Sequence, residues 1–133
     1  MKPLLVLLFI SAVAVAPIEA GIKDGNELSD ALSLWKKAQV GGSLSAGEQS
    51  KTAYVLGYLG GFLHSAASWE AFGENAPFRF PKGGIDESQF LKMVDKFLNE
   101  HPQRLHEIAD GLLLVVLRES FPNPAFKAPT PSR

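Results

Sequence analysis

The chain has no cysteine among its 133 residues. This absence excludes disulfide bonds, thiolate zinc sites, iron–sulfur clusters and cysteine nucleophiles together. An excess of charge is also absent, because 13 lysines and arginines are balanced by 14 aspartates and glutamates. A net charge of −1 argues against a strongly basic protein that binds nucleic acid or an anionic membrane surface. Only three histidines remain as candidate imidazole ligands or bases.

Internal repeats are absent too, and the composition excludes intrinsic disorder. Hydrophobic residues make up 46% of the chain and nine residues are phenylalanine, which is enough apolar material for a packed core. The length predicts a single small domain.

The first twenty residues have the form of a secretory signal peptide. Lys2 supplies a cationic start, and residues 4–15 form an apolar run interrupted only by Ser11. This run is too short to span the roughly 30 Å hydrocarbon core of a bilayer. The longest aliphatic run after it, Leu112 to Leu117, is shorter still, so no transmembrane helix is expected in the exported domain.

Cleavage is expected before Gly21, after the sequence Ile18-Glu19-Ala20. Ala14-Val15-Ala16 also has the small-x-small form, but the cut would then fall before Pro17, which distorts the scissile backbone. The alternative to cleavage is an uncleaved N-terminal anchor. We therefore expect a signal peptide over residues 1–20, a domain over 21–122 and a tail over 123–133.

Hydrophobic periodicity predicts an all-α fold, with about four helices packed as an irregular bundle. The third helix has the cleanest amphipathic pattern, with Phe90, Leu91, Val94, Phe97 and Leu98 on one face. Leu112–Leu117 alone is compatible with a buried strand, but the spacing upstream favours a helix. The predicted segments are residues 26–39, residues 45–68 with a capping box at Ser45 and Glu48, a helix from Asp86 to the break at His101-Pro102, and residues 102–120.

Two segments lie outside these predicted helices. Residues 71–85 combine glycines and prolines with Phe72, Phe78 and Phe80, so this loop is expected to lie against the core or against a partner. Residues 121–133 contain four prolines and are expected to be extended and largely mobile.

Three glycines interrupt the second predicted helix at Gly57, Gly60 and Gly61. Each costs about 0.5–1 kcal/mol relative to alanine in a helix interior, so a compensating role is expected. The spacing of Gly57 and Gly61 places them one turn apart and predicts the close approach of another helix of the domain. A contact with a ligand or with a second copy of the chain is the alternative.

The candidate catalytic residues are few, which favours a binding protein over an enzyme. His64 stands on the glycine side of its helix and is expected to be a hydrogen-bonded packing residue. His106 and Asp110 have i, i+4 spacing, which favours a surface ion pair, because a metal site needs more ligands. The four tryptophans and tyrosines allow a sugar-stacking site, although core or interface roles are favoured for them; they are Trp35, Tyr54, Tyr58 and Trp69. No cofactor or metal is expected.

Three motifs occur in a defined order along the chain. They are Val55-Leu-Gly-Tyr-Leu-Gly-Gly61, then Pro81 with Gln89 and Phe97-Leu98-x-x-His101-Pro102, and then His106-x-x-Ala109 with Phe121-Pro122. This order resembles the Tai-type immunity proteins, which are small periplasmic helical proteins that neutralise cell-wall amidase effectors of type VI secretion. The cysteines typical of that family would fall around Val55, around Arg79 and at Asn123, so the resemblance is to a cysteine-free variant.

The resemblance implies a periplasmic all-α protein, capable of forming a homodimer, that occludes the active-site cleft of a peptidoglycan amidase. Such an inhibitor needs no catalytic residue or cofactor. The candidate partner-binding residues are Trp69, Phe72, Phe78 and Phe80. The alternative is a periplasmic chaperone or stress protein that binds unfolded clients through exposed apolar surface. Neither function requires nucleic acid, or a membrane after signal cleavage.

Overall fold

The computed structural model describes residues 22–73 and 75–129, so the predicted signal peptide and cleavage site lie outside the described residues. Its fold is all-α, as predicted. No helix within the described ranges is long and apolar enough to span a bilayer. The elements are α1 (Gly25–Gln39), α2 (Ala46–Phe72), α3 (Glu87–Glu100), the short 3-10 helix η1 (Pro102–Arg104) and α4 (Ala109–Ser120).

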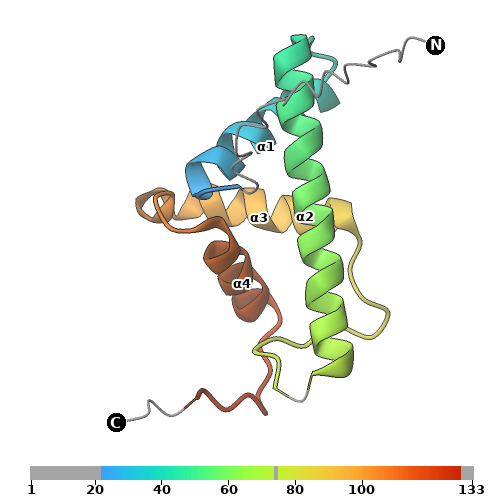
Figure 1. Cartoon of the computed structure of the whole chain (residues 1–133), viewed down its shortest axis with the longest axis vertical. Coiled ribbons are helices and arrows are strands. Elements are labelled where there is room, and N and C mark those ends of the chain that lie inside the picture. Colours follow the sequence, from blue (N-terminus) through green and yellow to red (C-terminus); the bar gives the residue numbers. More distant parts are fainter. Residues whose placement is uncertain (1–21, 74, 130–133) are drawn as a thin grey trace, which may run out of the picture.

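The longest helix, α2, runs along the long axis of the molecule, and the other helices pack to one side of it (Figure 1). α1 and α3 both contact α2, and α4 packs against α3 and α1. The buried side chains form one continuous core between these helices, which accounts for most of the expected stability of a chain without disulfides. Its largest fully buried members are Phe78, Phe90, Leu28, Leu32, Leu59, Leu112, Leu113 and Leu117.

Side-chain caps set the starts of the first three helices. The predicted capping box is present in α2, where Ser45 and Glu48 exchange side-chain and backbone hydrogen bonds. The Asp86 carboxylate accepts a 2.7 Å hydrogen bond from the backbone N–H of Gln89 and begins α3. Asp24 caps α1 in the same way.

The amphipathic stripe of α3 faces the core as predicted. All five of its apolar residues are buried, whereas Lys92 and Lys96 are exposed. Phe90 stacks on Phe62 of α2, with 6.2 Å between the ring centroids. The first turn of α3 is therefore joined to α2 by apolar packing, and α3 also contacts α1 and α4.

The prediction for the fourth helix is wrong at its start. Pro102 opens only the three-residue η1, and α4 begins at Ala109. Ile108 was expected in the buried stripe but is 72% exposed, because its backbone forms an isolated antiparallel bridge with Asp24. This pairing joins segments far apart in sequence and interrupts the helix. The segment Leu112–Leu117 is helical, as its upstream spacing indicated.

The first part of the C-terminal tail is hydrogen-bonded to the loop that follows α2. The side-chain amide of Asn123 donates to the carbonyl of Ala76 at 2.8 Å. Asn75 pairs with the backbone of Lys127 through both a donated and an accepted hydrogen bond. Residues 123 and 127 of the predicted tail therefore pair with this loop, while residues 130–133 lie outside the described ranges.

Candidate partner-binding site

The C-terminal end of α2 carries two of the four candidate partner-binding residues. α2 continues to Phe72, beyond the predicted end at residue 68, so Trp69 and Phe72 stand on a helix instead of a loop. Gly73 ends the helix, and its N–H donates a 2.7 Å hydrogen bond to the carbonyl of Trp69. Phe72 is 90% exposed and Trp69 is 42% exposed. Both rings are therefore available to a partner.

The other two candidates face the interior. Phe78 is 0% exposed, which corrects its assignment as a partner contact. It lies in an aromatic cluster: its ring centroid is 5.7 Å from Trp69, in an edge-to-face arrangement, and 5.3 Å from Phe80. Phe80 is partly buried and continues the cluster to Phe121 at 5.8 Å. Phe78 thus packs against Trp69 on the inner side of the site, and Phe80 packs against Phe78.

Trp69 connects this buried cluster to the surface. One side of its ring packs on Phe78, while the rest of the side chain is accessible. Phe72 lies three residues further along α2 and is almost entirely exposed. Trp69 and Phe72 together form what we call the aromatic tip of α2. Because the tip stands on a capped helix end, its backbone loses little conformational freedom on binding.

The three glycines of α2 have different surroundings. Gly60 is buried against the first turn of α3, where a Cβ atom would lie 3.0 Å from the Glu87 carboxylate. Gly57 and Gly61 are exposed, and a Cβ atom added at either position would meet nothing within 4 Å. The predicted close packing of Gly57 and Gly61 inside the domain is therefore wrong. The two glycines instead leave part of the surface of α2 smooth and uncharged.

The exposed face of α2 carries other small or uncharged residues at helical spacing. Four small residues recur every four positions, which places them along one side of the helix. Near the start of this face the side chain of Tyr54 is exposed, and the aromatic tip stands beyond its other end. The small residues are Ala53, Gly57, Gly61 and Ser65.

His64 is exposed, which corrects the expectation that it is a packing residue. His64 Nε2 lies 3.7 Å from Glu87 Oε1, and both side chains are largely exposed. Asp110 accepts a hydrogen bond from the Tyr58 hydroxyl, and no ion pair with His106 is formed. Burial, together with the Asp110 carboxylate, raises the pKa of Tyr58. No group of three or more potential ligands that could hold a metal occurs within residues 22–73 and 75–129.

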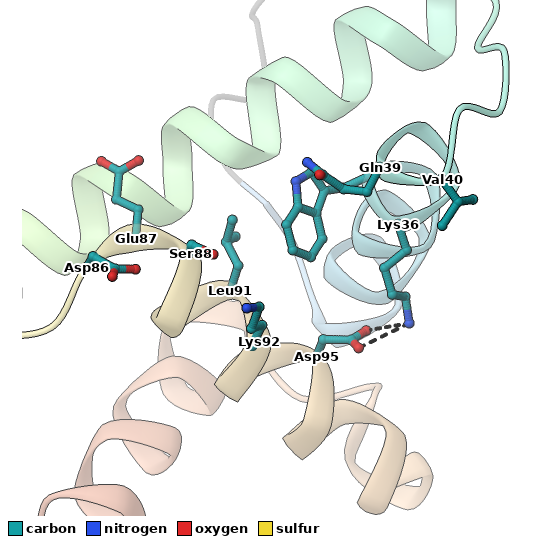
Figure 2. A pocket seen from close by; sticks show the side chains of 10 residues that line it. Lys36, Gln39, Val40, Asp86, Glu87, Ser88, Leu91, Lys92 and Asp95 are labelled. Carbon is teal, nitrogen blue, oxygen red and sulfur yellow. Dashed lines mark hydrogen bonds and ion pairs between the residues drawn. The ribbon is translucent and has the colours of Figure 1, made fainter.

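A groove of about 970 Å³ lies between α1 and α3 (Figure 2). Lys36 of α1 and Asp95 of α3 form an ion pair across it, with 2.8 Å between Nζ and Oδ1. Sequence reasoning missed this groove, because its two walls are about fifty residues apart and only Trp35 gave a local signal. The lining residues are Trp35, Lys36, Gln39, Val40, Asp86, Glu87, Ser88, Leu91, Lys92 and Asp95.

No family model, curated protein or solved structure matches this chain. Its function is therefore inferred from its own residues and from their arrangement.

Proposed function

We propose that this chain is an exported immunity protein that binds a peptidoglycan amidase of type VI secretion in the periplasm and occludes its active-site cleft. The contact is made by the aromatic tip, Trp69 and Phe72. The observation that carries this proposal is the 90% exposure of Phe72 beside Trp69, which is itself anchored on the buried Phe78. The partner is proposed to be an amidase because the order of the sequence motifs resembles that of the Tai-type immunity proteins.

The energetics of the aromatic tip support protein binding. Enclosing a phenylalanine side chain that was exposed contributes roughly 1.5–3 kcal/mol from apolar burial. Aromatic residues of this kind dominate the binding energy of interfaces when they enter a desolvated pocket. An inhibitor that works by occlusion needs such an anchor on a rigid support and no reacting group of its own.

The distribution of exposed apolar side chains favours one defined partner over many unfolded clients. Among the residues that the structure describes, five large hydrophobic side chains are exposed; three of them are on α2, and the other two are Val40 and Ile108. A chaperone of the alternative class would require a broad apolar surface to hold varied segments. The concentrated aromatic tip is better suited to a single complementary cleft.

The aromatic tip can be tested with a matched pair of variants. Phe72→Ala removes a ring that makes little contact within the domain, and we expect it to weaken binding to the amidase about tenfold or more. Val40→Ala is the control, because Val40 is 85% exposed but lies at the C-cap of α1, before the start of α2. α2 is 27 residues long, which places its two ends about 40 Å apart.

The measurement is calorimetric titration against the amidase encoded beside this gene, with thermal unfolding of each variant as a check on folding. We expect wild type and Val40→Ala to bind equally. No heat of binding for wild type would contradict the immunity function. Equal affinity of a folded Phe72→Ala variant would contradict only the position of the interface. Binding of a permanently unfolded client protein, without binding of the amidase, would support the chaperone alternative.

A further inference from the structure

We propose that the groove between α1 and α3 is a binding site for a short neutral oligosaccharide. This site is separate from the aromatic tip, and the inference does not depend on the proposed immunity function. The inference rests on the shape of the groove, on the indole of Trp35, and on the charged side chains of both signs that line the groove.

The two walls of the groove come from helices that are fixed by the core. Ser88, Leu91, Lys92 and Asp95 stand at i, i+3, i+4 and i+7 and so form one face of α3. Trp35, Lys36 and Gln39 of α1, with the C-cap residue Val40, supply the opposite wall (Figure 2). The volume of about 970 Å³ lies at the upper end of the range of small-molecule sites, which suits several linked rings better than one.

Trp35 gives the groove a flat apolar surface. Its side chain is partly buried and packs against the hydrophobic core, so its position is held from behind. The C–H face of a pyranose ring is apolar and can stack on the electron-rich face of an indole. Leu91, which is almost fully buried, adds apolar surface from α3.

The rest of the lining mixes apolar and polar surface, which suits a ligand that is itself amphiphilic. Seven of the ten lining residues carry a polar or charged group, while Trp35, Val40, Leu91 and the carbon stems of the longer polar side chains supply apolar surface. Sugar hydroxyls both donate and accept hydrogen bonds, so they match a mixture of amide, hydroxyl, carboxylate and ammonium groups.

The groove carries charged side chains of both signs. Lys36 and Asp95 form an ion pair, and Lys92, Asp86 and Glu87 add one more positive and two more negative groups. A ligand of either charge would therefore meet a like charge, whereas the lone pairs of the carboxylates can accept hydrogen bonds from neutral hydroxyls.

The test uses Trp35 as the reporter. The chain has two tryptophans, so Trp69→Phe leaves Trp35 as the single indole. Maltotriose, cellotriose and triacetylchitotriose are titrated separately while the indole emission is recorded. We expect a saturable change with at least one of them. Calorimetry of the unaltered chain with the same sugar checks that Trp69→Phe has not changed the groove.

Two variants, each with one glutamine replaced by alanine, test whether the sugar binds in the groove. Gln39→Ala removes an amide that lines the groove and should raise the dissociation constant about tenfold, which is the loss expected for one good hydrogen bond. Gln103→Ala removes an exposed amide in η1 and should leave binding unchanged.

Three results would overturn the proposal. The first is the absence of a saturable signal with all three sugars up to about 10 mM, beyond the millimolar range of weak affinities. The second is equal affinity of the Gln39→Ala and Gln103→Ala variants. The third is saturable binding of trialanine without binding of any sugar, which would make the groove a peptide site. None of these results bears on binding of the amidase to the aromatic tip.

Discussion

α2 and α3 contribute to the same core but differ on their outer faces. α3 buries one apolar stripe and presents lysine, aspartate, asparagine and glutamate on its other side. α2 buries Val55, Leu59 and Leu63, and its outer side carries small residues together with the exposed rings of Tyr54, Trp69 and Phe72. The two helices therefore differ in the side chains that they expose to solvent, which are polar on α3 and include three aromatic rings on α2.

The comparison indicates where the molecule meets another molecule. Burial of the apolar stripe of α3 leaves little hydrophobic surface on its polar outer face. The exposed rings of the aromatic tip keep hydrophobic surface in water at the end of α2, which a protein partner can cover. We therefore expect substitutions in the buried stripe of α3 to change stability, and substitutions in the aromatic tip to change binding of the amidase.

The largest effect is expected from the buried face of α3. Phe90→Ala removes a ring that is almost fully buried and stacked on Phe62, so the free energy of unfolding should fall by about 3–5 kcal/mol. Lys96→Ala, on the outer face of the same helix, should change it by less than about 0.5 kcal/mol. Urea unfolding midpoints that fall equally for both variants would show that the face assignment of α3 is wrong.

A smaller effect, of opposite sign, is expected on the outer face of α2. Gly61→Ala should raise the free energy of unfolding by about 0.5–1 kcal/mol, because alanine is the better helix former and its Cβ meets nothing within 4 Å. Gly60→Ala should gain less or lose stability, because its Cβ would stand 3.0 Å from the Glu87 carboxylate. Thermal unfolding of the two variants gives this comparison. A loss of stability in Gly61→Ala would mean that another copy of the chain already covers that face.

The smallest effect is expected at the start of α2 and depends on pH. The backbone N–H of Ser45 donates to the Glu48 carboxylate at 2.7 Å, and this hydrogen bond, with that to the Ser45 side chain, lowers the pKa of Glu48 below its usual 4.5. A lowered folded-state pKa stabilises the fold above about pH 4.5, and the contribution is lost as pH falls through the lowered value.

Glu48→Gln keeps the capping hydrogen bond but removes the titrating group. The stability advantage of wild type over this variant should be present at about pH 7 and should shrink toward about pH 3. Urea unfolding at both pH values measures it. An advantage that stays constant across this range would show that the Glu48 carboxylate does not contribute through its charge.

The features that the sequence predicted well are set by local patterns. The capping box at Ser45, the N-cap at Asp86 and the apolar stripe of α3 depend on residues within a few turns of one another. Their structural outcome therefore follows from helical geometry and capping chemistry alone.

The features that the sequence mispredicted depend on contacts between distant segments. The bridge between Asp24 and Ile108 delays the start of α4, and the pairing of Phe78 with Pro122 directs the loop phenylalanine inward. Phe72 lies in the last turn of α2 and not in the loop that the glycines and prolines of residues 71–85 predict. The groove between α1 and α3 forms only when the two helices pack.

The most direct test of the role of α2 is hydroxyl-radical footprinting of the chain, free and bound to the amidase, with oxidation read at single residues by mass spectrometry. We expect Trp69 and Phe72 to be oxidised readily in the free chain and to be protected in the complex. Trp35, in the separate groove, should be unchanged by the amidase. Full oxidation of Trp69 and Phe72 in a complex that is demonstrably formed would contradict the assignment of this face of α2 as the partner-binding surface.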